Sequence, residues 1–155
     1  ERRQELQLRH QRQVPLFLKI APDLDDDGLQ GIAHAMLERR QDTKSAQAQA
    51  LAQWGLIATK TTMARQAVAG HRHAQETGGL SGQPVRQASD RVVTYMRQAL
   101  GNDFPIIGVG GILSGEDAVS KRAAGADLVQ IYTGLIYRGP ALVQEVAQAL
   151  SKSRL

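Results

Sequence analysis

Four short apolar runs, with helix-type patterns between them, set the strongest limit on how this chain folds. The runs cover residues 16–21, 56–61, 105–109 and 128–132 and are rich in Leu, Ile and Val. Such runs are typical of strands in a parallel sheet, and strands that alternate with helices form right-handed βαβ units. The sequence therefore predicts a single α/β domain, residues 1–155, built from consecutive βα units.

Capping residues and apolar spacing indicate where the helices lie. An aspartate-rich turn precedes the apolar positions of a first helix that begins near Asp25. Residues 84–100 form an amphipathic pattern that ends at Gly101, and Ser114 with Asp117 caps a helix that Gly125 closes. A last helix is expected over residues 140–150. Residues 41–53, rich in Ala and Gln, are expected to be a surface insertion.

Composition excludes several classes of function. The chain has 155 residues, 42 % of them hydrophobic, and no cysteine, which rules out disulfide scaffolds, thiolate metal sites and a cysteine nucleophile. The net charge of +4 has few aromatic residues interleaved with it, so we expect a solvated helix face and no nucleic-acid site. No apolar run approaches the roughly 20 residues of a membrane span, which predicts a soluble chain.

Two groups of side chains resemble metal ligands only superficially. The aspartates at 23, 25 and 27 open a calcium-loop pattern, but His34 stands at the closing position that needs a glutamate. His71 and His73 have no third ligand at a metal-like spacing. We therefore expect no metal site.

Glycine and hydroxyl residues follow the last two apolar runs. Residues 108–111 read Gly-Val-Gly-Gly, and Leu113 stands where a dinucleotide fingerprint requires another glycine. Glycines leave backbone N–H groups open to a phosphate, and the helix near Ser114 is expected to add its positive end. With Tyr132 and Thr133 after the fourth run, these residues predict a phosphorylated cofactor. The alternative is that the glycines only shape turns.

Polar side chains at the first two runs are further candidates for ligand contacts. Lys19 lies between Leu18 and Ile20, where an ammonium is expected to meet an anion or an electron-rich cofactor, unless it reaches solvent from a sheet edge. Residues 59–61, Thr-Lys-Thr, end the second run. The long connection over residues 62–83 is predicted to be an active-site loop.

Five ordered motifs give the chain a family resemblance. They are residues 18–24, 57–62, 77–84, 105–111 and 128–134. Together they resemble the carboxyl-terminal half of quinone-dependent (class 2) dihydroorotate dehydrogenases. The resemblance implies a (β/α)8 TIM barrel of which this chain covers roughly the last four βα units. It also implies an FMN-dependent oxidoreductase that converts dihydroorotate to orotate in de novo pyrimidine (UMP) biosynthesis and passes electrons to quinone.

The resemblance assigns roles residue by residue. The expected cofactor contacts are Lys19, Thr59 and Gly82 at the flavin and Gly111, Tyr132 and Thr133 at its phosphate. Lys60 and Thr61 occupy the positions that contact the substrate. The family has asparagine where this chain has Lys60, and lysine donates hydrogen bonds but cannot accept them.

The chain is too short to hold every part of the enzyme that the resemblance implies. A complete barrel takes about 250 residues, so we expect the catalytic serine base and the membrane-docking helices in the other half and no catalytic residue here. The full-length family member is expected on the cytoplasmic side of a membrane as a peripheral protein, and the isolated chain is expected to turn over little dihydroorotate. The alternative is a catalytically silent FMN- or phosphate-binding half-barrel that pairs with an amino-terminal half or with itself.

Overall fold

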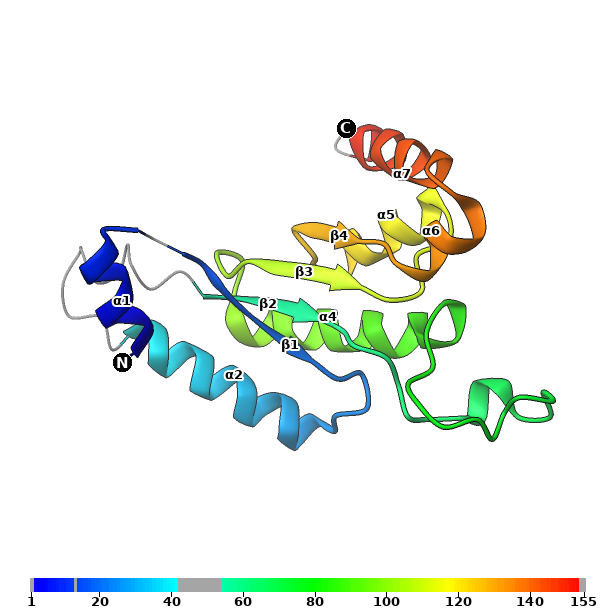
Figure 1. The fold of residues 1–155 in the computed structure, drawn as a ribbon, viewed down its shortest axis with the longest axis horizontal. Helices are drawn as coiled ribbons and strands as arrows, with labels where there is room; N and C mark the ends of the chain where they lie inside the picture. The colour runs from blue at the N-terminus through cyan, green and yellow to red at the C-terminus, as the bar shows by residue number, and fades with distance from the viewer. Residues whose placement is uncertain (1, 13, 42–53, 154–155) are drawn as a thin grey trace.

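A parallel sheet of four strands organises the molecule, as the computed structural model shows for residues 2–12, 14–41 and 54–153 (Figure 1). The strands are β1 (Leu16–Ile20), β2 (Trp54–Ala58), β3 (Ile106–Val109) and β4 (Leu128–Gln130). Each pairs in parallel with the next, so their order in the sheet is their order in the chain. Successive βα units of a barrel give this order, and the predicted α/β class is confirmed.

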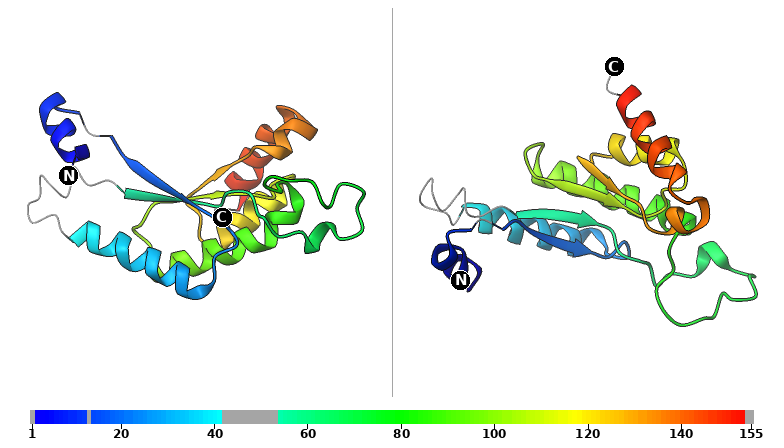
Figure 2. Two further views of the ribbon diagram at one scale, coloured as in Figure 1. Left: turned by 60° about the horizontal axis from the view of Figure 1, so that its bottom comes forward. Right: turned by 45° about the horizontal axis from the view of Figure 1, so that its top comes forward.

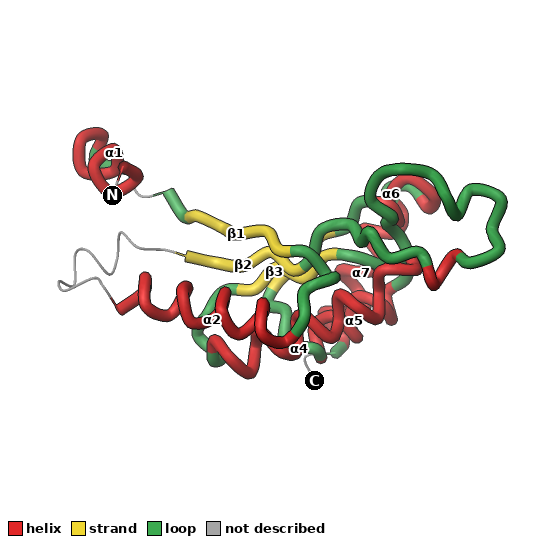
Figure 3. The backbone as a smooth tube through the Cα atoms, turned by 90° about the horizontal axis from the view of Figure 1, so that it is seen from below, coloured by secondary structure: helices red, strands yellow, loops and turns green. Residues whose placement is uncertain are grey.

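The described residues form six α-helices. They are α1 (Arg2–His10), α2 (Asp26–Gln41), α4 (Arg86–Leu100), α5 (Gly115–Ala123), α6 (Thr133–Arg138) and α7 (Ala141–Lys152). Two short 3-10 helices, η1 (Gln66–Val68) and η2 (Gln83–Val85), lie in the long connection before α4. Figure 3 shows α2, α4 and α5 beneath the strands, and Figure 2 shows α1 beyond the amino ends of β1 and β2. None of the described helices has the length and apolarity to cross a membrane.

The capping residues act as the sequence predicts. Asp25 accepts the N–H of Gly28 at 2.9 Å before α2, and Ser114 accepts the N–H of Asp117 at 3.2 Å at the start of α5. Gly101 follows α4 with a φ of 80°. These local signals needed no tertiary context because a cap bonds within its own turn.

The ends of two strands differ from the expectation. Strand β2 begins at Trp54 and stops at Ala58, so Thr59, Lys60 and Thr61 lie in the loop after it. Strand β4 stops at Gln130, and Tyr132 is already the N-cap of α6, a helix that the sequence did not indicate. Threonine and tyrosine are as common in strands as in the loops that follow them, so the sequence pattern does not mark these boundaries. The expected insertion at 41–53 lies outside the described residues from 42 onward.

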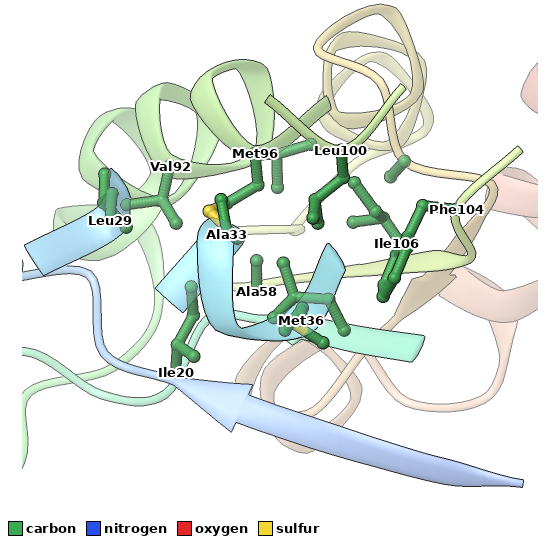
Figure 4. Packing of buried hydrophobic residues seen from close by; sticks show 13 residues of the cluster. Ile20, Leu29, Ala33, Met36, Ala58, Val92, Met96, Leu100, Phe104 and Ile106 are labelled. Atoms are coloured by element: carbon green, nitrogen blue, oxygen red, sulfur yellow. The ribbon is translucent and has the colours of Figure 1, made fainter. Parts of the chain in front are cut away.

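The main core lies between β1, β2, β3 and the helices α2 and α4. Figure 4 shows Leu29 and Ala33 of α2 beside Val92 and Met96 of α4, with Met36 near Ala58. Strand residues of the same cluster are Ile20, Leu56, Ala58 and Ile106. A second cluster joins α5 to α7 through Ile112, Ala118, Leu142 and Val146. The two clusters hold the helices against one face and fix the strand ends.

The opposite face of the sheet carries a row of side chains that is apolar apart from one lysine. Side chains alternate along a strand, so the neighbours of the core residues point away from the helices. Lys19, Ile57, Ile107 and Leu128 are register partners across the four strands. Leu128 is 64 % exposed, and no helix of the described chain covers this row (Figure 3). We call these four residues the open-face row.

Truncation of a core residue should lower the free energy of unfolding far more than truncation of a residue on the open face. Leu56 is fully buried in β2, so Leu56→Ala should lower the free energy of unfolding by about 3 kcal/mol, from lost burial plus a cavity. The same change at Leu128 should alter it by less than about 0.5 kcal/mol. Urea unfolding of both variants measures the difference, and equal losses would contradict this assignment of core and open face.

Candidate functional site

A pocket lies at the carboxyl ends of the strands. Its lining comes from the ends of all four strands and from the loop before η2, and it includes every predicted site residue: Lys19, Thr59, Lys60, Thr61, Gly82, Gly111, Tyr132 and Thr133. Among the described residues that form this lining are two lysines and no aspartate or glutamate. The pocket therefore favours an anionic ligand, and ligands of parallel α/β folds bind at this edge.

Backbone hydrogen bonds hold the floor of the pocket. The N–H of Thr59 donates to the carbonyl of Val109 and the N–H of Lys60 donates to the carbonyl of Ile20, both at 2.8 Å. These bonds continue the pairing of β2 with β3 and with β1 past the last strand residue. Thr59 is 1 % exposed, and the peptide bond before it is cis. Thr59 thus lies at the floor, whereas the side chains of Lys60 and Thr61 are exposed.

The loop after β3 has space for a ligand only because of its glycines. Gly110 and Gly111 have φ angles of 117° and 75°, which favour glycine. A Cβ at Gly111 would overlap Cβ of Arg86 and lie 2.5 Å from its Cα. The N–H groups of both glycines donate to no acceptor within the described residues. Two backbone donors are therefore available at the pocket wall.

The end of the long loop meets the start of α6 on the other side of the pocket. Gly82 lies so close to Thr133 that an added Cβ would be 3.1 Å from its Cγ2. Thr133 Oγ1 donates to Ser81 Oγ at 3.0 Å. Ser81 also lines the pocket, although it is not among the residues that the sequence predicts for the site. Its position inside a run of glycines, Gly78 to Gly82, was the available signal.

The positive end of α5, which the sequence was expected to offer to a phosphate, is partly used by protein acceptors. Ser114 Oγ accepts the N–H of Asp117 at 3.2 Å and Glu145 Oε1 accepts that of Gly115 at 2.7 Å, while Asp117 Oδ2 accepts the N–H of Leu113, just before the helix, at 2.9 Å. The Gly115 N–H and, after it, Arg138 hold the pKa of Glu145 below its ordinary value. Glu145 comes from α7, so only tertiary packing brings it to this helix end.

Lys19 and the long loop complete the site. Lys19 lies on strand β1, and its exposed side chain lines the pocket. Only the end of the 62–83 connection, at Ser81 and Gly82, lines the pocket, and its middle extends away from the sheet (Figure 1). Arg65 closes this middle part on itself by donating to the carbonyls of Glu76 and Gly78.

The middle of the loop surrounds a second, open hollow. His71 Nδ1 accepts the N–H of His73 at 3.2 Å, and His73 Nδ1 lies 2.5 Å from Glu76 Oε1. In the described part of the chain, no group of three or more side chains is arranged to hold a metal ion.

Comparison with known proteins gives a consistent result. The family model for dihydroorotate dehydrogenase matches residues 3–153. Proteins named dihydroorotate dehydrogenase (quinone) are 55 % identical in Delftia acidovorans, over 99 % of this chain and 41 % of the relative, and 60 % identical in Paracidovorax citrulli, over 90 % and 35 %.

A solved structure shows the same arrangement of elements. The crystal structure of the Eimeria tenella DHODH in complex with ferulenol has a TM-score of 0.74 and 39 % identity, over 87 % of this chain and 32 % of the other. The chain therefore spans about two fifths of the length of the curated relatives it matches.

Substitution of Gly111 tests the steric argument. Gly111→Ala combines an unfavourable φ with an overlap onto backbone and should lower the free energy of unfolding by roughly 3 kcal/mol or more. Gly101→Ala is the matched control, because its φ is also positive, at 80°, but an added Cβ meets nothing within 4 Å. Its cost should be about 1 kcal/mol. Chemical unfolding measures both, and equal costs would show that Arg86 does not restrict this loop.

The role of Glu145 predicts a pH dependence. A carboxyl group whose pKa is lowered on folding stabilises the fold above its unfolded value of about 4.5, and this contribution disappears as the pH falls through the lowered value. The difference in unfolding free energy between wild type and Glu145→Gln should therefore be larger at pH 6 than at pH 3. Urea titrations at the two pH values measure it. A difference independent of pH would contradict the assigned contact with Gly115.

Proposed function

Because the chain belongs to the dihydroorotate dehydrogenase family, we propose that its pocket binds FMN in a flavoprotein that oxidises dihydroorotate to orotate in de novo pyrimidine (UMP) biosynthesis, with quinone as electron acceptor. One observation carries the proposal: the eight residues to which the resemblance gives roles all line one pocket with two lysines and no carboxylate in its described lining. That charge balance suits a phosphate and a substrate carboxylate.

The residues after β3 and β4 fit a phosphate. Gly111 is forced to be glycine by Arg86, and its N–H and that of Gly110 lack protein acceptors in the described chain. Backbone N–H groups at positive-φ glycines form anion-binding concavities. Thr133 adds a hydroxyl, and Tyr132 adds its backbone at the start of α6. We assign the phosphate to Gly111, Tyr132 and Thr133.

The residues of β1 and β2 fit the ring system. FMN, when bound, supplies the two-electron acceptor that oxidation of dihydroorotate requires. The Lys19 ammonium would stabilise negative charge on an electron-rich ring, and Thr59 and Gly82 would bound the ring on two sides. Val109 and Ile131 contribute apolar lining that excludes water. These roles orient the cofactor and tune the charge around it.

Lys60 and Thr61 are the proposed substrate contacts. Lys60 is exposed at the rim, its backbone N–H is fixed to Ile20, and its ammonium would pair with the carboxylate of dihydroorotate. Thr61 packs so closely on Gly79 that a Cβ there would overlap its hydroxyl oxygen. Lysine offers only donors, so the ring carbonyl or carboxylate groups, and not a ring N–H, would face Lys60.

The remaining length of the relatives would supply what this chain's pocket lacks. The pocket lining in the described chain holds no histidine or carboxylate base, and its serine, Ser81, already bonds Thr133. The open-face row and the edges of β1 and β4 would pack against the other part of the barrel, which would carry the serine base, the quinone contacts and the peripheral membrane association. The alternative is a catalytically silent FMN-binding half-barrel, and the one observation that favours it is the lack of a base in this lining.

Flavin binding by the chain itself tests the proposal. FMN fluorescence should be quenched on titration with the chain, and Thr133→Val should weaken FMN binding about tenfold through one lost hydrogen bond to a charged group. Thr94→Val, on the exposed face of α4, is the matched control and should bind as wild type does. Absence of quenching by wild type would overturn FMN binding.

Turnover separates the enzyme from the silent module. Dihydroorotate should bleach the bound flavin little when the chain is alone, and bleaching should appear when the complementary part of a curated relative is added. Rapid bleaching by the chain alone would overturn the need for the other part. No bleaching after a stable complex forms would favour the silent half-barrel.

A further inference from the structure

A charged cluster lies buried beneath the carboxyl end of β3, outside the pocket lining. Lys121 of α5 is 0 % exposed, its Nζ lies 2.5 Å from Asp90 Oδ1 of α4, and it donates to Ser89 Oγ at 2.8 Å. Gly108 leaves room for it, because a Cβ there would overlap the Lys121 side chain. We call Lys121, Asp90 and Ser89 the Lys121 cluster.

This cluster is costly to bury, which requires an explanation. Burial lowers the pKa of Lys121, against the opposing effect of Asp90. Apolar residues often replace a buried ion pair without loss of stability. The fold alone therefore does not account for an ammonium at this position, and the hydrogen bonds of the cluster indicate what it does.

The cluster fixes the direction of one hydroxyl. An ammonium has donors and no acceptor, so Ser89 must accept from Lys121 and turn its own hydrogen elsewhere. That hydrogen goes to the carbonyl of Val109 at 2.7 Å. The same carbonyl accepts the Thr59 N–H at 2.8 Å and, at the longer distance of 3.5 Å, the Thr59 hydroxyl, so both of its lone pairs are used. The Val109 carbonyl is thus held by Thr59 after β2 and by Ser89 of α4 beneath the sheet.

Holding this carbonyl also fixes the first glycine of the loop. The carbonyl of Val109 and the N–H of Gly110 belong to one planar peptide unit and point in opposite directions. Gly110 lines the pocket, and its N–H has no acceptor in the described chain. Glycine has little conformational preference of its own, so its orientation depends on such outside contacts.

We propose that Ser89, held by Lys121, is a positioning residue that fixes the Gly110 peptide so that its N–H is presented as a preset donor to a phosphoryl group in the pocket. The identity of the ligand, a phosphorylated flavin, rests on the proposed function. The constraint on Gly110 does not. Preset donors bind an anion more tightly because the loop is ordered before the ligand arrives.

The constraint can be measured without a ligand. Amide ¹⁵N relaxation of the chain should show lower order parameters at Gly110 and Gly111 in Ser89→Ala than in wild type. Ser120→Ala is the matched control: Ser120 Oγ also contacts the cluster, at Asp90 Oδ2 at 3.4 Å, but does not bond Val109. It should leave both glycines unchanged. Unchanged order parameters in Ser89→Ala would overturn the proposal.

The consequence for binding is specific to the phosphate. Ser89→Ala should weaken FMN binding about tenfold and change riboflavin binding, which involves no phosphate, less than about twofold. Lys121→Met added to Ser89→Ala should not lower the FMN-to-riboflavin ratio further, because Lys121 acts through Ser89. Equal loss of both flavins would mean that Ser89 has only a structural role and would overturn the positioning role.

A folding failure and a failure of flavin binding can each be told apart from a failure of this proposal. If Ser89→Ala fails to fold, Ser89→Cys keeps the shape with a weaker donor and should show the same selective loss for FMN. If wild type binds neither flavin, the proposed function is wrong, while the relaxation data still decide whether Ser89 constrains Gly110.

Discussion

The parallel register of the four strands is the constraint on which the rest of the site depends. Each strand pairs with its predecessor in the chain, so all four carboxyl ends open at one edge, and residues more than 100 positions apart, such as Lys19 and Tyr132, line one pocket. A shift of one residue in any pairing would turn every side chain of that strand to the other face. The core side chains of β1, β2 and β3 prevent this shift, and they thereby determine the chemistry of the pocket.

Small residues then decide how closely the helices approach this edge. Gly111 admits Arg86 of α4, and Gly108 admits Lys121 of α5. The close approach brings charged side chains beneath the loop after β3, where Arg86 pairs with Asp117 and Lys121 pairs with Asp90 and Ser89. The same loop is held at its far end by Asp117 and Arg138, on the N–H and the carbonyl of Leu113. The loop is therefore supported at both ends by groups that do not line the pocket.

The sequence predicts the local features well and the distant contacts poorly. The four strands, the caps at Asp25 and Ser114, and the eight lining residues follow from patterns within one segment or from motifs that resemble a family. The occupation of the α5 amino end by Glu145 does not, because that carboxylate comes from 30 residues away and only the packing of α7 on α5 brings it there. The pairing of Lys121 with Asp90 is hidden for the same reason.

The unpaired edges of the two outer strands affect how copies of this chain associate. Within the described residues, β1 and β4 each pair on one side only, and Leu16 and Leu18 of β1 are 41 % and 42 % exposed. An unpaired strand edge with apolar side chains is a template for adding further strands. We therefore expect copies of this chain to associate first through these strands, and Lys19 is the one charge within β1 that opposes such growth.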